Sequence, residues 1–316
     1  MGIFSSIKEF GNECSEPICL ALGMFDGVHI GHRQVLDAAI NQSNESEGLA
    51  VAFTFPEHPA RFLRPEQAPL LLMNPEQKAL SLQAYGMKEV IMQSFDAELA
   101  EIPFTVFPDF LKRGIPSLSG VCVGQNFRFG KGRAGDSSLL REIAVKAGLK
   151  VNIVESINCD SLPVSSSRIR EALSLGNIEQ VNQMLGRDYS IFGVVSSGKG
   201  MGRKIGFPTL NLDWDPEAKP AYGVYAGEVK NIKTGIILPA VANYGLRPTL
   251  ESNVLVPKFE INILADLNEA EWECGSELNM SLKFFLRPEK KFQSVEKLSE
   301  QIHLDREKAI KLVNQK

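Results

Sequence analysis

The feature that most constrains this chain is an apolar run that passes directly into a glycine-rich turn and then into a helix. Residues 18–22 read ICLAL, which predicts a short buried strand. The next ten residues, 23–32, read GMFDGVHIGH. The glycines at 23, 27 and 31 allow a tight turn and a close approach of the backbone to a ligand. Residues 32–40 have helical spacing, so the segment is predicted to be a strand, a turn and a helix start.

Two histidines, His29 and His32, lie at this predicted helix start. A helix start presents free N–H groups and the positive end of the helix dipole, which suits phosphate. Residues three apart share one helix face, so both imidazoles can point at one phosphate. The pattern favours nucleotidyl transfer, in which the histidines donate to charge developing on a phosphoryl group. The alternative is that both are ordinary polar residues of a loop.

The whole string resembles the HxGH signature of the nucleotidyltransferase superfamily. The preceding GMFDG resembles the FMN adenylyltransferase module of the prokaryotic riboflavin kinase/FAD synthetase family. This resemblance implies that His29 and His32 are catalytic. It also implies cofactor-binding roles for Gly23, Phe25, Asp26 and Gly27.

The rest of the first half alternates between predicted strands and helices. Such alternation implies parallel pairing through right-handed crossovers, with ligands at the carboxyl ends of the strands. The turns 23–29, 54–59 and 124–130 all follow strands, so we expect them to converge on one crevice. The predicted strands are 18–22, 49–55, 89–95, 119–123 and 150–155, and the predicted helices begin near 31, 75, 104 and 136.

Three more stretches of this half resemble the same family. Residues 54–59, TFPEHP, resemble its second motif and imply a ligand contact for His58, which alone would equally be a surface histidine. Residues 123–130, VGQNFRFG, resemble the flavin-proximal loop. There Asn126 can hydrogen-bond an isoalloxazine edge and Phe127 can pack on its face, with core packing as the alternative for the phenylalanine. Residues 164–170, VSSSRIR, resemble the closing motif and imply cofactor-binding roles for Ser165 and Arg168, whose guanidinium offers donors to the ATP β- and γ-phosphates. Helix capping is the alternative for the serines, and the two roles are compatible.

The second half has a different predicted secondary structure, because strands and glycine turns follow one another without helices between them. This predicts a small antiparallel barrel, followed by one or two helices over residues 295–313 that pack against it. We place the domain boundary between 185 and 186. The predicted barrel strands are 189–195, 209–212, 224–229, 236–242, 258–264 and 280–285.

Residues 193–212 read GVVSSGKGMGRKIGFPTLNL. The glycines permit a backbone loop around phosphates, although a plain flexible turn is the alternative. The added GRxxGFPTxN resembles the riboflavin kinase signature. The resemblance implies that Thr209 and Asn211 help position Mg²⁺ and the nucleotide phosphates, an oxygen chemistry that suits this cation. It also implies cofactor-binding roles for Gly198, Gly200, Gly202 and Lys204.

Three later stretches complete the kinase resemblance. Residues 243–249 (NYGLRPT) imply cofactor-binding roles for Asn243 and Arg247, and residues 285–292 (FLRPEKKF) imply one for Arg287. Residues 258–260 (KFE) map Glu260 to the general base that takes the proton from the ribityl 5′-hydroxyl. By itself, a glutamate in a strand of alternating polar and apolar residues usually lies on the solvated face. Residues 264–275 are longer than the family pattern and lack its tyrosine.

Bulk composition excludes several classes of function. The formal net charge is −4, so we expect no nucleic acid partner. The five cysteines form no CxxC pair, which favours reduced thiols in a cytoplasmic protein. We see no signal peptide and no transmembrane run, and expect no membrane partner. We expect a monomer or a weak homo-oligomer.

The resemblance covers nearly the whole chain, with both modules in the family's order. It implies a Rossmann-like nucleotidyltransferase domain with a parallel sheet over 1–185 and an antiparallel β-barrel kinase domain with a terminal helix over 186–316. The barrel would make FMN from riboflavin and ATP, the first domain would join FMN to AMP, and Mg²⁺ would serve both. One rival is an adenylyltransferase for another acceptor. A second is a flavin- or nucleotide-binding regulator whose kinase half has lost turnover, supported by the altered 264–275 segment alone.

Overall fold

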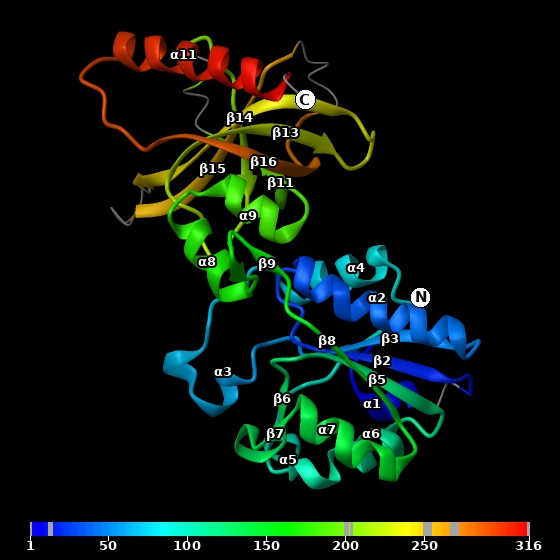
Figure 1. The fold of residues 1–316 in the computed structure, drawn as a ribbon. Helices are drawn as coiled ribbons and strands as arrows, with labels where there is room; N and C mark the ends of the chain where they lie inside the picture. Colours follow the sequence, from blue (N-terminus) through cyan, green and yellow to red (C-terminus); the bar gives the residue numbers. More distant parts are fainter. Residues whose placement is uncertain are drawn as a thin grey trace. The chain divides into compact units, whose positions relative to one another are not determined.

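The computed structural model describes residues 2–11, 15–198, 202, 205–248, 255–265 and 272–314. Its internal contacts divide the chain into two compact units, residues 1–168 and 169–316. Each unit is described by itself below (Figure 1). Within the described ranges no helix combines the length and the apolar character that a membrane span requires.

The first unit is built on a parallel six-stranded sheet in the order β1-β4-β3-β2-β5-β8. The predicted parallel sheet is therefore confirmed. Its strands are β1 (Ile3–Phe4), β2 (Ile18–Leu22), β3 (Leu49–Thr54), β4 (Glu89–Met92), β5 (Leu118–Gly124) and β8 (Lys150–Val154).

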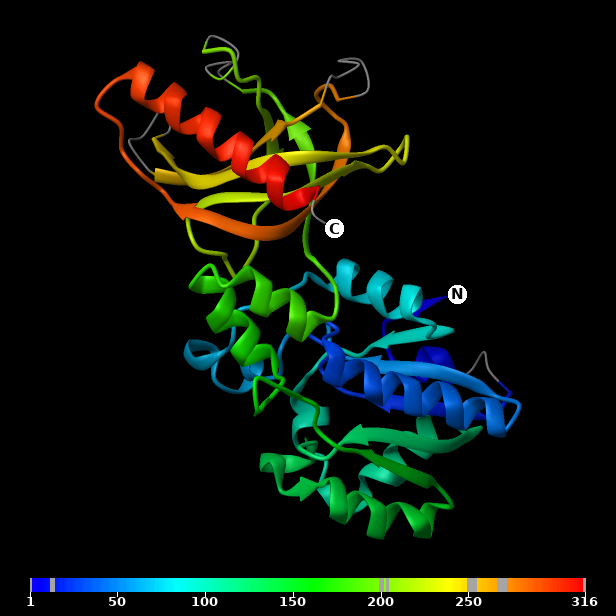
Figure 2. The same cartoon turned by 45° about the horizontal axis from the view of Figure 1, so that its top comes forward.

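Helices cover both faces of this sheet, as the ribbon of Figure 2 shows. Successive side chains of a strand point to opposite faces. Thus Ile18, Leu20 and Leu22 of β2 belong to one core cluster, and Cys19 and Ala21 to another. The first cluster includes residues of α1 (Ile7–Gly11), α6 (Phe107–Gly114) and α7 (Ser137–Ala144), and the second includes residues of α2 (Ile30–Glu45) and α4 (Pro75–Tyr85).

Local chemistry explains where α4 begins and ends. Asn74 caps the helix by accepting from the Gln77 backbone N–H, and the Gln77 side chain returns a bond to the Asn74 backbone. Pro75 occupies the first helical position, where its missing N–H costs nothing. Gly86 ends the helix with a φ of 120°. The predicted start of this helix is confirmed.

Several short elements of this unit were not predicted. The two-residue strand β1 adds to the sheet edge beside β4. Two small hairpins pair β6 (Arg128–Phe129) with β7 (Gly135–Asp136), and β9 (Asn158–Cys159) with β10 (Leu162–Pro163). The remaining short helices are α3 (Ala60–Leu63), α5 (Ala97–Ala100) and the 3₁₀ turns η1 (Pro65–Gln67), η2 (Phe104–Val106), η3 (Lys131–Arg133) and η4 (Val145–Ala147).

The second unit is a closed antiparallel barrel in the order β11-β12-β15-β14-β13-β16. This confirms the predicted barrel. Helix α8 (Ser166–Ser174) begins in the first unit, and α9 (Ile178–Leu185) precedes the barrel. The barrel strands are β11 (Tyr189–Ser196), β12 (Leu210–Asp213), β13 (Gly223–Asn231), β14 (Ile237–Pro248), β15 (Leu255–Ile263) and β16 (Glu277–Pro288).

A single terminal helix, α11 (Val295–Val313), packs against the barrel in both ribbon views (Figures 1 and 2). Ala309 and Val313 of this helix form one core cluster with Val224, Val241 and Leu286 of the barrel strands. Ser294 caps its start by accepting from the Lys297 backbone N–H. The helix therefore covers one side of the barrel, and the prediction of one or two helices resolves to one.

Candidate functional sites

The turn after β2 has an unusual backbone. Phe25 and Val28 have φ values of 49° and 40°, and Gly27 has a φ of 84°. Non-glycine residues with positive φ are uncommon and persist where surrounding contacts hold them. Gly23 contributes by lacking a side chain, since a Cβ there would lie 2.9 Å from the Phe25 ring. The predicted ligand-binding turn is thus a strained one.

Contacts from three other segments hold this turn. The Asp26 carboxylate is 1% exposed and accepts from the backbone N–H groups of Leu72 and Met73, with Oδ1···N distances of 2.9 and 3.3 Å. The Thr54 hydroxyl donates to the Met24 carbonyl over 2.9 Å, and the Ser166 hydroxyl to the Asp26 carbonyl over 2.9 Å. The first turn therefore meets the end of β3 and the start of α8.

The two histidines come together at the start of α2. His29 is the N-cap residue, and its Nδ1 accepts from the His32 backbone N–H over 3.2 Å. This bond assigns the His29 proton to Nε2. The two rings are stacked, with centroids 3.5 Å apart and planes 13° apart. Gly31 leaves room for this arrangement, because a Cβ there would lie 3.2 Å from the His29 ring.

The surroundings of His32 favour its neutral form. Burial lowers the pKa of its imidazole well below 6.5, and the neighbouring His29 and Lys78 lower it further. Its Nδ1 atom is buried and has no hydrogen-bond partner within the described part of the chain. A buried polar atom without a partner is rare and needs an explanation, for which a bound ligand is one candidate.

A lysine that the sequence analysis did not single out lies beside these groups. Lys78 of α4 is fully buried, and its Nζ donates to the carbonyls of Met24 over 3.3 Å and Phe55 over 2.6 Å. Burial lowers the pKa of its ammonium to about 8, against the opposing effect of the Asp26 carboxylate. Helical spacing could have indicated that this lysine is buried, because Lys78 shares one helix face with Leu82 and lies beside the buried Ala79.

The other predicted residues of the first unit have these surroundings. The His58 ring accepts from the Ala60 backbone N–H over 3.1 Å at the start of α3. The exposed Asn126 side chain donates to the Ser156 hydroxyl over 3.3 Å. Phe127 stacks on the buried Phe129, with ring centroids 5.6 Å apart. Phe129 therefore belongs to the core, and Phe127 keeps a partly exposed ring.

Ser165 and Arg168 lie at the start of α8. The Ser165 hydroxyl accepts from the Arg168 backbone N–H over 3.3 Å, so the predicted capping bond is present. The Arg168 guanidinium donates from Nη1 to the carbonyls of Leu162 and Pro163, and from Nη2 to that of Cys159. It therefore holds the β9–β10 hairpin against the helix start.

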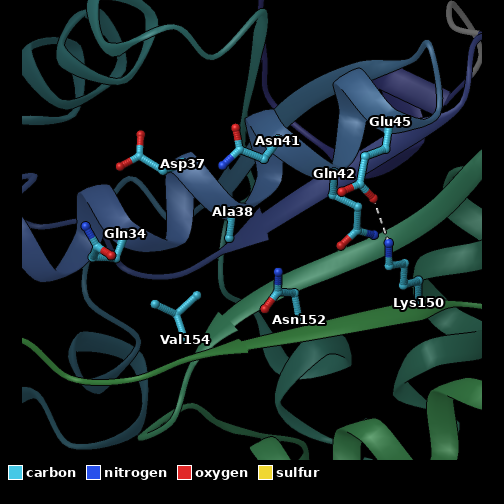
Figure 3. Close-up of a pocket in the computed structure, with 9 residues that line it drawn as sticks. All are labelled: Gln34, Asp37, Ala38, Asn41, Gln42, Glu45, Lys150, Asn152 and Val154. Atoms are coloured by element: carbon cyan, nitrogen blue, oxygen red, sulfur yellow. Dashed lines mark hydrogen bonds and ion pairs between the residues drawn. The ribbon is translucent and has the colours of Figure 1, made fainter.

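Figure 3 shows a separate polar pocket of about 440 Å³ between α2 and β8. Its walls include Gln34 and Asp37 of α2 and an ion pair between Glu45 and Lys150, whose Oε2 and Nζ atoms are 2.8 Å apart. None of its lining residues belongs to the predicted sites. The pocket is distinct from the turn that carries the histidines.

In the second unit, three predicted residues form one row across neighbouring strands. Asn211 of β12 is opposite Glu260 of β15, and Glu260 is opposite Asn243 of β14. Residues directly opposite each other point to the same face of a sheet. The alternate residues, including Phe259 and Ile261, are buried in the barrel, so the row faces the outside.

Two glycines of the predicted phosphate loop lie against this region. A Cβ at Gly198 would lie 2.0 Å from the Asn211 side-chain nitrogen, and one at Gly202 would lie 3.1 Å from the Thr209 hydroxyl. Any side chain at 198 would displace the amide. The predicted residues Gly200 and Lys204, and positions 266–271 of the divergent loop, lie outside the described residues. The backbone of Arg247 belongs to β14.

Arg287, predicted on the flavin side, is bound to helix α11. Its Nε and Nη2 donate to both carboxylate oxygens of Asp305 over 2.8 to 3.1 Å, and its Nη1 donates to the Pro288 carbonyl. Asp305 is 6% exposed and also accepts from Gln301. A fork-shaped pair of this kind is strong and directional, so this arginine fastens the terminal helix to β16.

Two further residues that sequence reasoning missed connect α11 to the kinase motif. Asn262 of β15 donates to the Pro208 carbonyl over 2.7 Å, and Arg306 of α11 donates from Nη1 to the Asn262 side-chain oxygen. His303 and Arg306 both approach the Phe207 ring. Pro208 precedes Thr209 in the chain, so the contacts of α11 reach the segment that carries the predicted metal-positioning residues.

Together these features define a two-domain transferase, with a parallel-sheet nucleotidyltransferase unit followed by a barrel kinase unit. Comparison with known proteins agrees. A family model described as FAD synthetase matches residues 11–168, and one described as riboflavin kinase matches residues 185–313.

Curated relatives align along nearly the whole chain. A bifunctional riboflavin kinase/FMN adenylyltransferase of Haemophilus influenzae is 32% identical over 94% of this chain and 95% of its own. A second protein of the same name, from Bacillus subtilis, is 33% identical over 92% of this chain and 91% of its own length. A crystal structure described as a macrolide-efflux protein from Streptococcus pneumoniae has a TM-score of 0.85 at 27% identity, covering 96% of this chain and 97% of that one. The chain belongs to the bifunctional riboflavin kinase/FMN adenylyltransferase family.

Proposed function

We propose that this chain makes FMN from riboflavin and then FAD from FMN, using one ATP-dependent site in each unit. The names of its full-length relatives and of the two matching family models support both reactions. The observation that carries the first site is the stacked pair His29 and His32 at the start of α2, with the unpartnered Nδ1 of His32.

At the first site the phosphate of FMN attacks the α-phosphorus of ATP and pyrophosphate leaves. The imidazoles and backbone N–H groups at the α2 start donate to the phosphoryl oxygens, on which charge develops in the transition state. His29 donates from Nε2 in this proposal, because its Nδ1 accepts the capping bond. The glycines and Phe25 of the turn let the nucleotide approach the backbone.

Arg168 supports the leaving pyrophosphate in this proposal. A guanidinium has five N–H donors. Three bonds to carbonyls hold Arg168 in place, and within the described residues they leave two donors for phosphate oxygens. Asn126 and the partly exposed Phe127 offer an amide and a ring face to the isoalloxazine. His58 belongs to the 54–59 turn, which we expect to line the same crevice.

At the second site Glu260 takes the proton of the riboflavin 5′-hydroxyl, whose oxygen then attacks the γ-phosphorus of ATP. Thr209 and Asn211 supply a hydroxyl and an amide oxygen, which are donors that fit Mg²⁺. The cation would neutralise phosphate charge there. Within the described residues, no cluster of three or more His, Cys, Asp or Glu side chains could hold a metal. The ligand set would therefore be completed by phosphate oxygens and water.

The proposal includes the other motif residues of this half. Gly198, Gly200, Gly202 and Lys204 belong to the sequence segment proposed to bind phosphate, and Asn243 and Arg247 belong to β14. Arg287 acts through α11, because Asp305 occupies its guanidinium. We assign residues 1–185 to adenylyl transfer and 186–316 to the kinase, and we expect a cytoplasmic protein that is a monomer or a weak homo-oligomer.

One incubation tests the two activities. The purified chain is mixed with riboflavin, ATP and Mg²⁺, and the flavins are separated at intervals. We expect FMN to appear first and FAD to follow. Formation of FMN without FAD would contradict the proposed adenylyl transfer. Formation of FAD from added FMN, but never from riboflavin, would contradict the proposed kinase activity.

A further inference from the structure

Helix α4 is fastened to the strained turn by two charges of opposite sign. The Asp26 carboxylate accepts from the backbone N–H groups of Leu72 and Met73, which directly precede the helix. In the other direction, the Lys78 ammonium in the first turns of the helix donates to the Met24 carbonyl of the turn. The carboxylate is 1% exposed and the lysine is fully buried.

A buried ammonium is costly, because water no longer solvates its charge. The two acceptors of Lys78 are backbone carbonyls, which satisfy two of the three ammonium N–H donors and carry no opposing charge. An apolar side chain of the same length would avoid this cost, but it would leave the buried Asp26 carboxylate without the opposing charge of the ammonium. The lysine therefore interacts both with the backbone of two turns and with the charge of Asp26.

The two carbonyls belong to different site segments. Met24 is in the turn that presents His29 and His32, two residues before Asp26. Phe55 follows the end of β3 and starts the TFPEHP turn that leads to His58. A single Nζ atom, 3.3 Å from one carbonyl oxygen and 2.6 Å from the other, therefore bridges the ends of two neighbouring parallel strands.

The charge also acts on the histidines. Lys78 disfavours a second positive charge nearby, and with burial and His29 it lowers the pKa of the His32 imidazole. The opposing charge close to the ammonium is Asp26. A neutral His32 imidazole adds no positive charge against the stacked His29 ring, whose Nδ1 accepts the capping bond. Geometry and charge thus favour the same arrangement of the ring pair.

We propose that Lys78 is a positioning residue for adenylyl transfer, whose ammonium ties the 23–28 turn to the 55–58 turn and thereby holds His29 and His32 in their reactive placement. This inference rests on the proposed role of the two histidines in that reaction. Lys78 itself touches no reacting atom. It acts through the backbone carbonyls of Met24 and Phe55.

Two substitutions test the bridge. Lys78→Met keeps the length of the side chain and removes both the charge and the donors. Lys78→Gln keeps a neutral donor group that can still reach a carbonyl. Lys88→Met is the matched control, because Lys88 is an exposed lysine just beyond the same helix. FAD formation from added FMN is measured over a range of ATP concentrations, and riboflavin phosphorylation by the same preparation reports on folding of the other unit.

We expect kcat for FAD formation to fall about 10²-fold in Lys78→Met, the scale of a small misplacement of catalytic groups. Lys78→Gln should recover part of that loss. The KM for ATP should change less than kcat, since the histidines act on the transition state. Riboflavin phosphorylation should match that of the Lys88→Met control.

Three outcomes would overturn the inference. One is a kcat in both Lys78 variants equal to that of the control. Another is a rise in KM with kcat unchanged, which would make Lys78 part of ATP binding alone. The third is parallel loss of both activities in Lys78→Gln, which would make the lysine a general stability element. Wild-type chain that forms no FAD would instead reject the proposed function, so the two failures are distinguishable.

Discussion

The two sites organise polar groups in opposite ways. The first depends on groups that are buried: Asp26 and His29 are 1% and 6% exposed, and Lys78 is fully buried. The second is a row of half-buried polar side chains on the outside of a barrel, placed opposite one another by strand register. One site is held by contacts between turns, and the other by the ladder of the sheet.

This difference has consequences for mutation. In the first site, backbone strain at Phe25 and Val28 persists only while Asp26, Thr54 and Lys78 hold the turn. Members of such a network are coupled, so their losses are not additive. In the second site the barrel is fixed by its own hydrogen-bond ladders, so a side chain of the row can change without moving its neighbours.

The largest expected effect is at the histidine pair. His29→Ala combined with His32→Ala should reduce FAD formation from FMN by at least about 10³-fold, because each position removes a donor to developing phosphoryl charge. FMN formation from riboflavin should remain near the wild-type rate, and it serves as the control for folding. Loss of both activities in a folded chain would reject independent sites.

The second effect is at the row on the barrel. Glu260→Gln should lower the rate of riboflavin phosphorylation by about 10²-fold or more, the scale of a general base, and leave FAD formation from FMN unchanged. Glu277→Gln is the matched control, because Glu277 is an exposed glutamate on another barrel strand. A near-wild-type rate of FMN formation in Glu260→Gln would remove this carboxylate from the role of base.

The predicted parts of the fold are those that local chemistry determines. Asn74, Pro75 and Gly86 mark the ends of α4 in the sequence itself, and short apolar runs mark the sheet strands. Strand β1 escaped prediction because its two residues pair with Val90 and Ile91, far along the chain. Pairing with a strand so distant in the sequence produces no recognisable pattern in a segment of two residues.

The predicted parts of the sites are the motif residues, and the missed ones are their supports. Nothing in the sequence marks the carbonyls of Met24 and Phe55 as acceptors, so the role of Lys78 could not be derived before the turns were placed. The same holds for Asn262, whose acceptor is the Pro208 carbonyl. Asp305 likewise could not be paired with Arg287 until α11 was docked on the barrel.

A smaller effect is expected where α11 supports the second site. Arg306→Met removes the donor to Asn262, which holds the Pro208 carbonyl just before Thr209. The loss of a hydrogen bond to a charged group is worth about 1.5 kcal/mol, so the KM for ATP in FMN formation should rise about tenfold.

Lys311→Met is the control for Arg306→Met, since Lys311 is an exposed cation on the same helix. FAD formation from FMN should stay unchanged in both variants. A KM for ATP equal to that of the control would show that the second site is held by its strands alone, which would sharpen the contrast between the two sites.

The smallest expected effect is a pH dependence of stability, which we expect in the first unit and not in the barrel, because it arises from a buried histidine of the first unit. Because the pKa of His32 is lower in the folded chain than its ordinary 6.5, the unfolded chain binds a proton that the folded chain excludes once the pH falls below 6.5. The free energy of unfolding of the first unit should therefore decrease from pH 7 to 5.5, by at most about 1.4 kcal/mol per pH unit for one group. Lys78, with a pKa of about 8, stays largely charged across this range.

Hydrogen exchange of the α2 amides at pH 7 and 5.5, corrected for the intrinsic rates, measures this decrease. His32→Gln removes the titrating ring, so the difference between wild type and variant isolates its contribution from that of the carboxylates. Exchange in the barrel strands of the same samples is the internal control, and it should show no such difference. An equal loss of α2 protection in wild type and His32→Gln would mean that the imidazole carries its proton in the folded chain, and the first site would then work with a charged histidine.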